Sequence, residues 1–160
     1  MIETLTNEEI EDVLRKNILG RLGCCDGNKV YVVPINYVYD GQHIIAHSPE
    51  GMKIQMMRKN PNVCFEVDEM KDITHWQSVI VWGYYQEFTA ERDRYHAMQL
   101  FSDKMLHMKT KSTSNISSRI TSIEHLLNVA GKSKPVIYRI IPVEKTGRFE
   151  LGNIPAQKSL

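Results

Sequence analysis

The chain has 160 residues and a mass of 18.5 kDa, which is the usual size of one folded domain. Hydrophobic residues make up 42% and charged residues 24%, an ordinary globular composition that excludes an intrinsically disordered protein. The formal net charge is +1 with scattered cations, which argues against a nucleic-acid partner, and no apolar run is long enough to span a membrane.

The start of the chain and its cysteines indicate a cytoplasmic protein. The first residues include the acid Glu3 and lack the pattern of a signal peptide. Cys24, Cys25 and Cys64 are odd in number and two are adjacent, so they fit neither a disulfide framework nor a zinc-binding pair. We expect reduced thiols packed in strands. No set of histidines has the spacing of a zinc site, so no metal is predicted.

A helix is predicted first in the chain. Thr6 and Glu9 form a capping-box pattern, and apolar residues recur at helical spacing as far as Ile18. Gly20 is the expected stop. We therefore predict an N-terminal helix within residues 1–19, whose single apolar stripe lies on the rest of the domain.

The next part of the chain predicts short antiparallel strands rather than alternating strands and helices. Two Asp-Gly pairs, at residues 26–27 and 40–41, are hairpin signals. Gly83 lies inside a long predicted strand and indicates a bulge or bend. A loop is predicted at residues 70–74. The expected strands cover residues 21–25, 30–39, 43–47, 62–68, 76–88 and 135–141, with a further short one at 148–151.

Further helices complete the predicted architecture, at residues 51–59, from Thr89 to about Phe101, and at 116–127. Closing several short strands into a barrel removes their exposed edges. We therefore predict a mainly β fold, a six-stranded antiparallel β-barrel with flanking helices. It forms one domain over residues 1–160 and ends in a loose tail at 152–160.

The segment from His47 to Lys53 carries the groups that a phosphate monoester needs. It lies where a predicted strand ends and a helix begins, and the free N–H groups of a helix start favour an anion. Ser48 adds a hydroxyl donor, Gly51 allows close approach, and Lys53 supplies positive charge. The alternative is structural, because Ser48 followed by Pro49 is also a common helix start and Lys53 would then be an ordinary solvated lysine.

Several other side chains are candidates for a ligand contact or for packing. Pro34 in a strand needs an edge or a ligand beside its missing N–H. Asn36 is polar between apolar neighbours, so it needs a partner from a ligand or from the backbone. Tyr37, Trp76 and Trp82 are more typical of a core or an interface. The methionine-rich stretches have the same explanation.

Five stretches follow one another in a recognisable order: residues 33–41 (VPINYVYDG), 44–48 (IIAHS), Gly51-x-Lys53, 58–67 (RKNPNVCFEV) and 76–83 (WQSVIVWG). In this order they resemble the pyridoxamine 5'-phosphate oxidase-like flavin-binding proteins, and within that family the nitroimidazole-resistance (Nim) branch. The similarity covers Ile18 to Phe88 and, more weakly, the final strand.

The resemblance implies an FMN-binding split β-barrel that forms a homodimer, with two FMN sites at the subunit interface. A small-molecule substrate would complete the list of partners. Position by position, the resemblance implies that the flavin ring is lined by Pro34, Ile35, Asn36 and Tyr37, that the phosphate end is held by His47, Ser48 and Lys53, and that the neighbouring long strand contributes Trp76, Ser78 and Val79.

The implied function is that of an FMN-dependent oxidoreductase acting on a small nitro-aromatic or quinone-like acceptor. His47 or Tyr37 is a candidate proton donor, and His43 is expected to flank one pocket together with His47. A protein that only binds or sequesters flavin or haem shares nearly all of these features. Pyridoxamine phosphate oxidation is disfavoured, because Arg139 and Arg148 are the only arginines in the C-terminal region.

Overall fold

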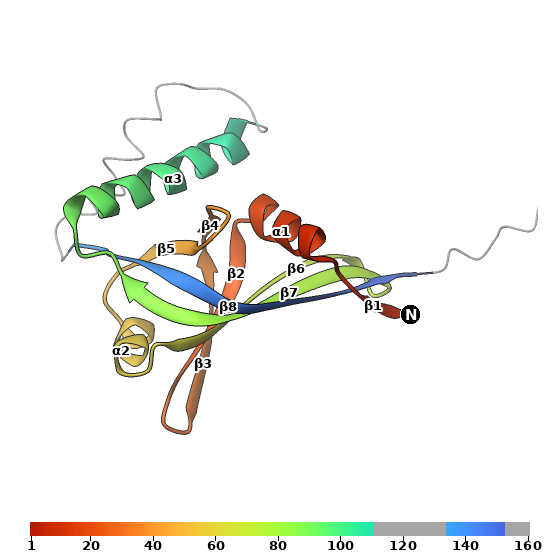
Figure 1. The fold of residues 1–160 in the computed structure, drawn as a ribbon, viewed down its shortest axis with the longest axis horizontal. Helices are drawn as coiled ribbons and strands as arrows, with labels where there is room; N and C mark the ends of the chain where they lie inside the picture. The colour runs from red at the N-terminus through yellow and green to blue at the C-terminus, as the bar shows by residue number, and fades with distance from the viewer. Residues whose placement is uncertain (111–133, 153–160) are drawn as a thin grey trace, which may run out of the picture.

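The computed structural model describes residues 1–110 and 134–152, which form an antiparallel sheet with three helices (Figure 1). The helices are α1 (Asn7–Lys16), α2 (Met52–Lys59) and α3 (Glu91–Thr110). The strands are β1 (Ile2–Thr4), β2 (Leu19–Asp26), β3 (Lys29–Asn36), β4 (Val38–Tyr39), β5 (Ile44–Ser48), β6 (Asn62–Asp72), β7 (His75–Glu87) and β8 (Val136–Leu151).

The sheet curls until its two edges meet. Its strand order is β3-β2-β6-β7-β8-β5-β4, and β1 pairs with the end of β8. The edge strands β3 and β4 are joined through Tyr37, and β3 also contacts β5. The predicted mainly β barrel class is therefore confirmed. The described residues hold eight strands rather than six, because the expected strand at 30–39 is divided at Tyr37 and Ile2–Thr4 adds a strand that pairs with β8. The short strand expected at 148–151 is the continuous end of β8.

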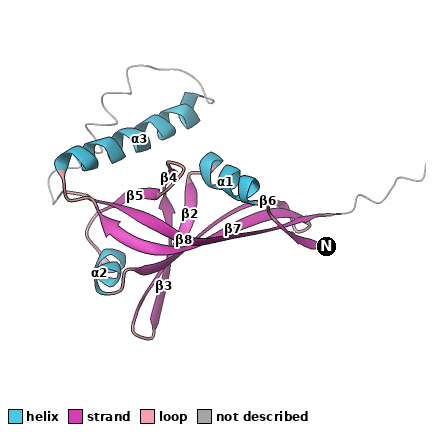
Figure 2. Cartoon of the chain, viewed as in Figure 1, coloured by secondary structure: helices cyan, strands magenta, loops and turns pink. Residues whose placement is uncertain are grey.

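The apolar residues divide into a main core and a smaller cluster under α3. Figure 2 shows α1 and α3 on one side of the sheet and α2 on the other, near the end of β5. Leu14 of α1 packs into the main core with Phe65 and Tyr138, and all three side chains are fully buried. The smaller cluster joins Ile45 of β5 to Phe101 of α3. None of the three described helices is long and apolar enough to cross a membrane.

Local sequence signals explain where α1 begins and ends. The capping box is confirmed, since Thr6 Oγ1 accepts from the Glu9 N–H at 3.3 Å and the Glu9 carboxylate accepts from the Thr6 N–H at 2.7 Å. The helix ends at Lys16, before the expected stop at Gly20. The reason is Asn17, whose backbone is extended and whose side-chain amide donates to the Val13 carbonyl at 2.9 Å.

The predictions of the two turns and of the bulge agree with the structure better than the prediction of the loop. Gly27 and Gly41 adopt positive φ of 58° and 98° at the two predicted turns. The register of β7 against β8 shifts at Gly83, where a Cβ would clash with the Ile141 carbonyl oxygen. The loop predicted at residues 70–74 is shorter in the structure, because β6 continues to Asp72 and only a two-residue turn at 73–74 separates it from β7.

The remaining sequence predictions concern the second half of the chain. Helix α3 runs to Thr110, well beyond the expected end near Phe101. The helix predicted at 116–127 lies outside the described residues, and so does nearly all of the tail predicted at 152–160.

Candidate functional site

The segment from His47 to Lys53 joins β5 to α2 and leaves the start of that helix uncapped. Gly51 is the N-cap residue, and its carbonyl accepts the first helical hydrogen bond, from the Gln55 N–H at 3.1 Å. No side chain caps the helix, so its first-turn N–H groups remain available to an anion. The alternative prediction of a helix beginning at Ser48-Pro49 was wrong, because α2 begins at Met52.

Lys53 lies in the first turn of this helix with its side chain half-buried. No described residue forms an ion pair or hydrogen bond with its ammonium group. Burial lowers the pKa of Lys53, and the nearby Cys24 thiol acts in the opposite direction. A partly desolvated charge without a partner is unfavourable. A bound anion would replace the favourable interaction with water that the ammonium group loses on burial.

Ser48 and His47 point to opposite faces of β5, as neighbouring strand residues must. Ser48 is only 3% exposed, and its hydroxyl donates to the Pro49 carbonyl at 2.7 Å. That hydroxyl has to rotate before it donates to a ligand. The His47 ring lies edge-on to Phe101 of α3, with the ring centroids 4.7 Å apart. The structure therefore places the two residues at one strand end but does not aim them at one point.

His47 is held as a neutral imidazole at pH 7. Burial lowers its pKa, and the positive charge of Lys53 lowers it further. A neutral imidazole is a poor general acid, which disfavours the role of proton donor. The effect of Lys53 also shows that its ammonium lies within electrostatic range of His47.

An ion-pair bridge fixes the loop between β5 and α2 and neutralises its carboxylate. Arg58 donates to both oxygens of Glu50, at 2.7 and 3.0 Å, and to both oxygens of Glu87, at 2.5 and 3.1 Å. These hydrogen bonds hold the pKa of Arg58 above its usual range. Glu50 is the only carboxylate between His47 and Lys53, so pairing removes the charge that would repel an anion.

The second group of candidates, on β3, divides between surface and core. Pro34 and Asn36 are exposed, and Pro34 lies in an edge strand, as its missing N–H requires. Because Asn36 is exposed, it needs no protein partner. Ile35 is buried, and Tyr37 is fully buried with its hydroxyl bound to the Leu14 carbonyl at 2.9 Å. The backbone N–H of Tyr37 also donates to the Ile18 carbonyl at 2.9 Å, so of its polar groups only the carbonyl is left for a ligand.

The β3 and β5 groups lie side by side. Val38 pairs with Ile45 in the β4–β5 ladder. Two residues earlier in the chain β3 ends at Asn36, and β3 contacts β5. The candidates on these two strands therefore lie on neighbouring elements within one chain.

The third group of candidates, on β7, lies at the other end of the molecule (Figure 1). Ser48 pairs with Val136 of β8, whereas Trp76 pairs with Glu150, fourteen positions further along that strand. Fourteen residues of extended strand span roughly 45 Å. The Ser78 hydroxyl donates to Glu66 at 2.9 Å, and Val79 is fully buried in the core. Within one chain these residues cannot share a ligand with Lys53.

The remaining candidates behave as small packed groups. Cys24 is buried, Cys25 and Cys64 are half-buried, and all three are free thiols, as expected. Burial raises the pKa of Cys24 and Cys64, which keeps both thiols protonated at neutral pH. Across residues 1–110 and 134–152, no three histidine, cysteine, aspartate or glutamate side chains converge as metal ligands would.

Comparison with known proteins assigns the family. The model of the pyridoxamine 5'-phosphate oxidase family matches residues 6–148, so the chain belongs to this family. A curated relative, an uncharacterized protein of Rhizobium meliloti, is 36% identical over 107 residues, which are 64% of this chain and 71% of the relative.

Two solved structures share the fold. A FAD-binding protein from Mesorhizobium loti has a TM-score of 0.71 and 30% identity, over 94% of this chain and 99% of that one. A protein from Bacteroides thetaiotaomicron, named for 5-nitroimidazole antibiotic resistance, has a TM-score of 0.66 and 20% identity, over 93% and 89% of the two chains. The second likeness shows the fold alone, so the Nim branch is a distant structural neighbour. The predicted family itself is confirmed by the family model.

The link between Lys53 and His47 gives a first prediction. In a Lys53→Met variant, the pKa of His47 rises, because one of the two causes of its lowering is gone, but it stays below the ordinary 6.5 because the ring is still buried. NMR titration of the imidazole measures this directly. Lys59→Met, in the same helix, is the control and leaves the pKa unchanged. An identical His47 pKa in wild type and Lys53→Met would contradict the geometry.

Proposed function

We propose that the protein is a flavoprotein that binds FMN between two protomers and uses it to reduce a small nitro-aromatic or quinone-like acceptor. The observation that carries the proposal is the half-buried, unpaired ammonium of Lys53 beside the uncapped start of α2. A phosphate monoester satisfies both the ammonium and the free N–H groups. Family membership and the flavin nucleotide of the Mesorhizobium protein support the choice of ligand.

FMN fits the single unpaired cation of α2 better than FAD does. Both carry a phosphate next to the ribityl chain, but FAD continues into a second phosphate group and an adenosine, which need contacts of their own. The other cations of α2 are Arg58, paired with Glu50 and Glu87, and Lys59, paired with Asp26 at 2.6 Å. The helix therefore offers one unpaired cation, which suits the single phosphate of FMN.

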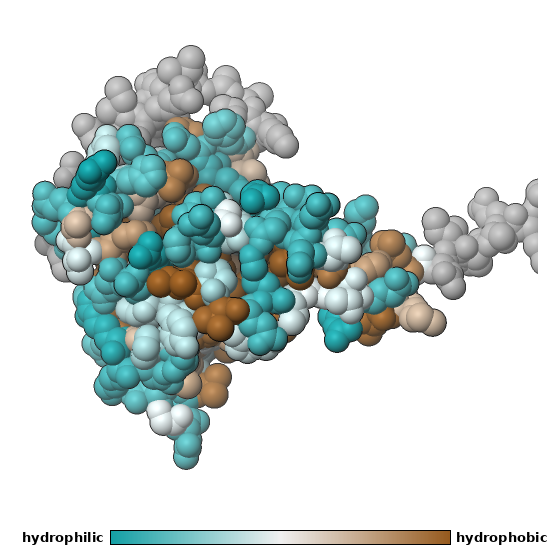
Figure 3. Space-filling model, in the orientation of Figure 1, coloured by the Kyte–Doolittle hydropathy of each residue, from teal (hydrophilic) through white to brown (hydrophobic). Residues whose placement is uncertain are grey.

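The exposed apolar side chains of the sheet favour a homodimer. The ladders place Val32, Gly23, Cys64 and Trp82 in one row across four neighbouring strands, and Val32 is 61% and Trp82 41% exposed. Apolar side chains also lie open at the end of the molecule that carries β1 (Figure 3), where Ile2, Met70, Ile73 and Leu151 are exposed. Surfaces of this kind commonly mark protein contacts.

A two-fold dimer also resolves the separation of the candidate residues. Lys53 and the start of α2 would hold the phosphate, with Asn36 beside the ring. Trp76 of the partner subunit would contact the same flavin, because the two-fold axis brings the far end of the partner's sheet to this site. The bound flavin would supply the hydride or electron transfer, while the chain's residues position it and exclude water.

Oxidation of pyridoxamine phosphate is not the activity that we propose, although the family is named for it. Its substrate carries a second phosphate, and the arginines of β8 are not arranged to hold one together. Arg139 is bound to Gln86, whereas Arg148 donates to Thr4 at the other end of the strand. Nine positions of extended strand separate the two arginines.

Removal of the charge at residue 53 tests the phosphate site. FMN binding to Lys53→Met weakens by about tenfold or more, because one charge-assisted hydrogen bond contributes ~1.5–3 kcal/mol. Fluorescence titration with FMN measures the affinity. Lys59→Met, whose side chain is exposed and paired with Asp26, leaves it unchanged. The thermal midpoint of flavin-free Lys53→Met does not fall, since a desolvated charge is lost. Unchanged FMN affinity in Lys53→Met would contradict the assignment.

Mixing two variants tests whether each site is shared between protomers. Lys53→Met and Trp76→Ala each bind FMN weakly when alone. After joint unfolding and refolding, half of the dimers are mixed and each has one intact site, so about a quarter of all sites bind FMN at wild-type affinity. The control replaces Trp76→Ala with the Lys53→Met/Trp76→Ala double variant and recovers none. Full binding by Trp76→Ala alone, or no recovery in the mixture, would rule the shared site out.

Turnover is tested with the flavin-loaded protein under anaerobic conditions. NADH or NADPH bleaches the visible flavin band, and a nitroimidazole or a quinone then restores it. Stopped-flow absorbance follows both half-reactions. A flavin that binds tightly but resists both nucleotides would instead support the non-catalytic alternative, a protein that only binds or sequesters flavin.

A further inference from the structure

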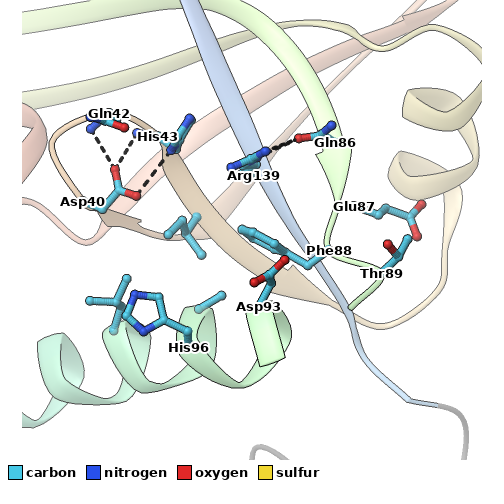
Figure 4. Close-up of a pocket in the computed structure, with 13 residues that line it drawn as sticks. Asp40, Gln42, His43, Gln86, Glu87, Phe88, Thr89, Asp93, His96 and Arg139 are labelled. Atoms are coloured by element: carbon cyan, nitrogen blue, oxygen red, sulfur yellow. Dashed lines mark hydrogen bonds and ion pairs between the residues drawn. The ribbon is translucent and has the colours of Figure 1, made fainter. Parts of the chain in front are cut away.

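A concave pocket lies between α3 and the sheet, apart from the proposed flavin site (Figure 4). The pocket has a volume of about 430 Å³, within the usual range for small-molecule sites. Its walls come from the β4–β5 loop, β5, the end of β7, β8 and the first half of α3. None of the ten residues assigned to the flavin lines it. Of the two histidines expected to flank one pocket, only His43 does so.

Arg139 of β8 is the cation of this pocket, and its orientation is fixed. Its guanidinium lies over the ring of Phe88, 5.4 Å from the centroid. Its Nε and Nη2 donate to the Gln86 side-chain oxygen at 2.8 and 2.5 Å. A guanidinium has five N–H donors, and the Nη1 group takes part in neither bond. No described carboxylate pairs with Arg139, so its outer edge is free for a two-pronged contact with an anion.

The carboxylates around the pocket compete little for that edge. Asp40 accepts from the N–H groups of Gln42 and His43 at 2.7 and 2.6 Å, which ties it to its own turn. Glu87 is bound to Arg58 and to the Tyr85 hydroxyl. These bonds lower the pKa of both carboxyls and hold them as satisfied anions.

Asp93 is the third carboxylate and the exception. It is exposed in the first turn of α3, on the opposite side of Phe88 from Arg139 in Figure 4, and no described residue pairs with it. An acid in this position is favoured by the helix dipole. The negative charge of Asp93 would repel an anionic ligand. Replacing this residue therefore tests whether the ligand charge is negative or positive.

The apolar part of the lining belongs to the cluster under α3, whereas Gln42, His43, Thr89 and His96 add polar groups. Ile45 and Ala97 are buried in that cluster, and Phe88 and Leu100 pack against it. These groups offer a dry surface to a small hydrophobic body beside the charged edge of Arg139.

We propose that this pocket binds a small amphipathic carboxylate, with the carboxyl group on the free edge of Arg139 and the apolar part on Phe88, Ile45 and Leu100. The contact pairs an oriented guanidinium with a planar anion, and the apolar floor sets the size of the ligand. Ligand binding in this pocket does not depend on the flavin, because no residue from His47 to Lys53 lines the pocket.

Three probes with one apolar body test the charge that the pocket selects. Phenylacetate, phenylacetamide and phenethylamine are titrated separately into the whole protein, and methyl NMR follows Ile45, Ala97 and Leu100. We expect phenylacetate to shift these methyl signals and to bind about tenfold or more tighter than either other probe. Equal or tighter binding of phenethylamine, or methyl signals that do not move with phenylacetate, would overturn the proposal.

Variants of the lining locate the contact. Arg139→Gln weakens phenylacetate binding by about tenfold, whereas Arg148→Gln, an arginine at the far end of the same strand, leaves it unchanged. Asp93→Asn strengthens binding or leaves it unchanged, because it removes a negative charge. Weaker phenylacetate binding in Asp93→Asn, or unchanged binding in Arg139→Gln, would refute the assignment. FMN affinity is the same in all three variants as in wild type.

Discussion

The half-buried ammonium of Lys53 is the feature on which the proposed site depends. It is carried by α2, which packs against β2, and it loses hydration there without gaining a carboxylate among the described residues. The acid that lies nearest in sequence, Glu50, is held by Arg58 instead. The fold therefore keeps a positive charge at the uncapped end of a helix. An anion placed there relieves the charge and the free N–H groups together.

The length of the strands decides how many chains the proposed flavin site would need. Because β8 pairs with β5 at one end and with the start of β7 at the other, the residues at the two ends are held far apart by the ladder itself. A change of side-chain conformation cannot reduce the distance between the two ends of a paired strand. A site that uses both ends therefore requires a second copy, and the apolar side chains exposed across the sheet provide a surface on which such a copy would pack.

Signals between near neighbours in the chain predicted their structures well, such as the Thr6–Glu9 cap, the Asp-Gly turns and the shift at Gly83. The segment from His47 to Lys53 was also placed correctly where a strand ends and a helix begins. The early end of α1 also has a local cause at Asn17, but the contacts that were missed at the site depend on distant parts of the chain. Arg58 reaches Glu87 across 29 positions, and the pocket at Arg139 is assembled from elements that lie far apart in the sequence. The periodicity of the sequence does not predict such long-range contacts, because they form only when distant elements pack together.

The central claim is that the start of α2 recognises the phosphate of a flavin. The most direct measurement compares the affinities of FMN and riboflavin, which differ only in that phosphate, for the same flavin-free protein. We predict that FMN binds at least about tenfold more tightly, since riboflavin leaves the ammonium of Lys53 and the helix start without an anion. Equal affinities for the two flavins would contradict the account.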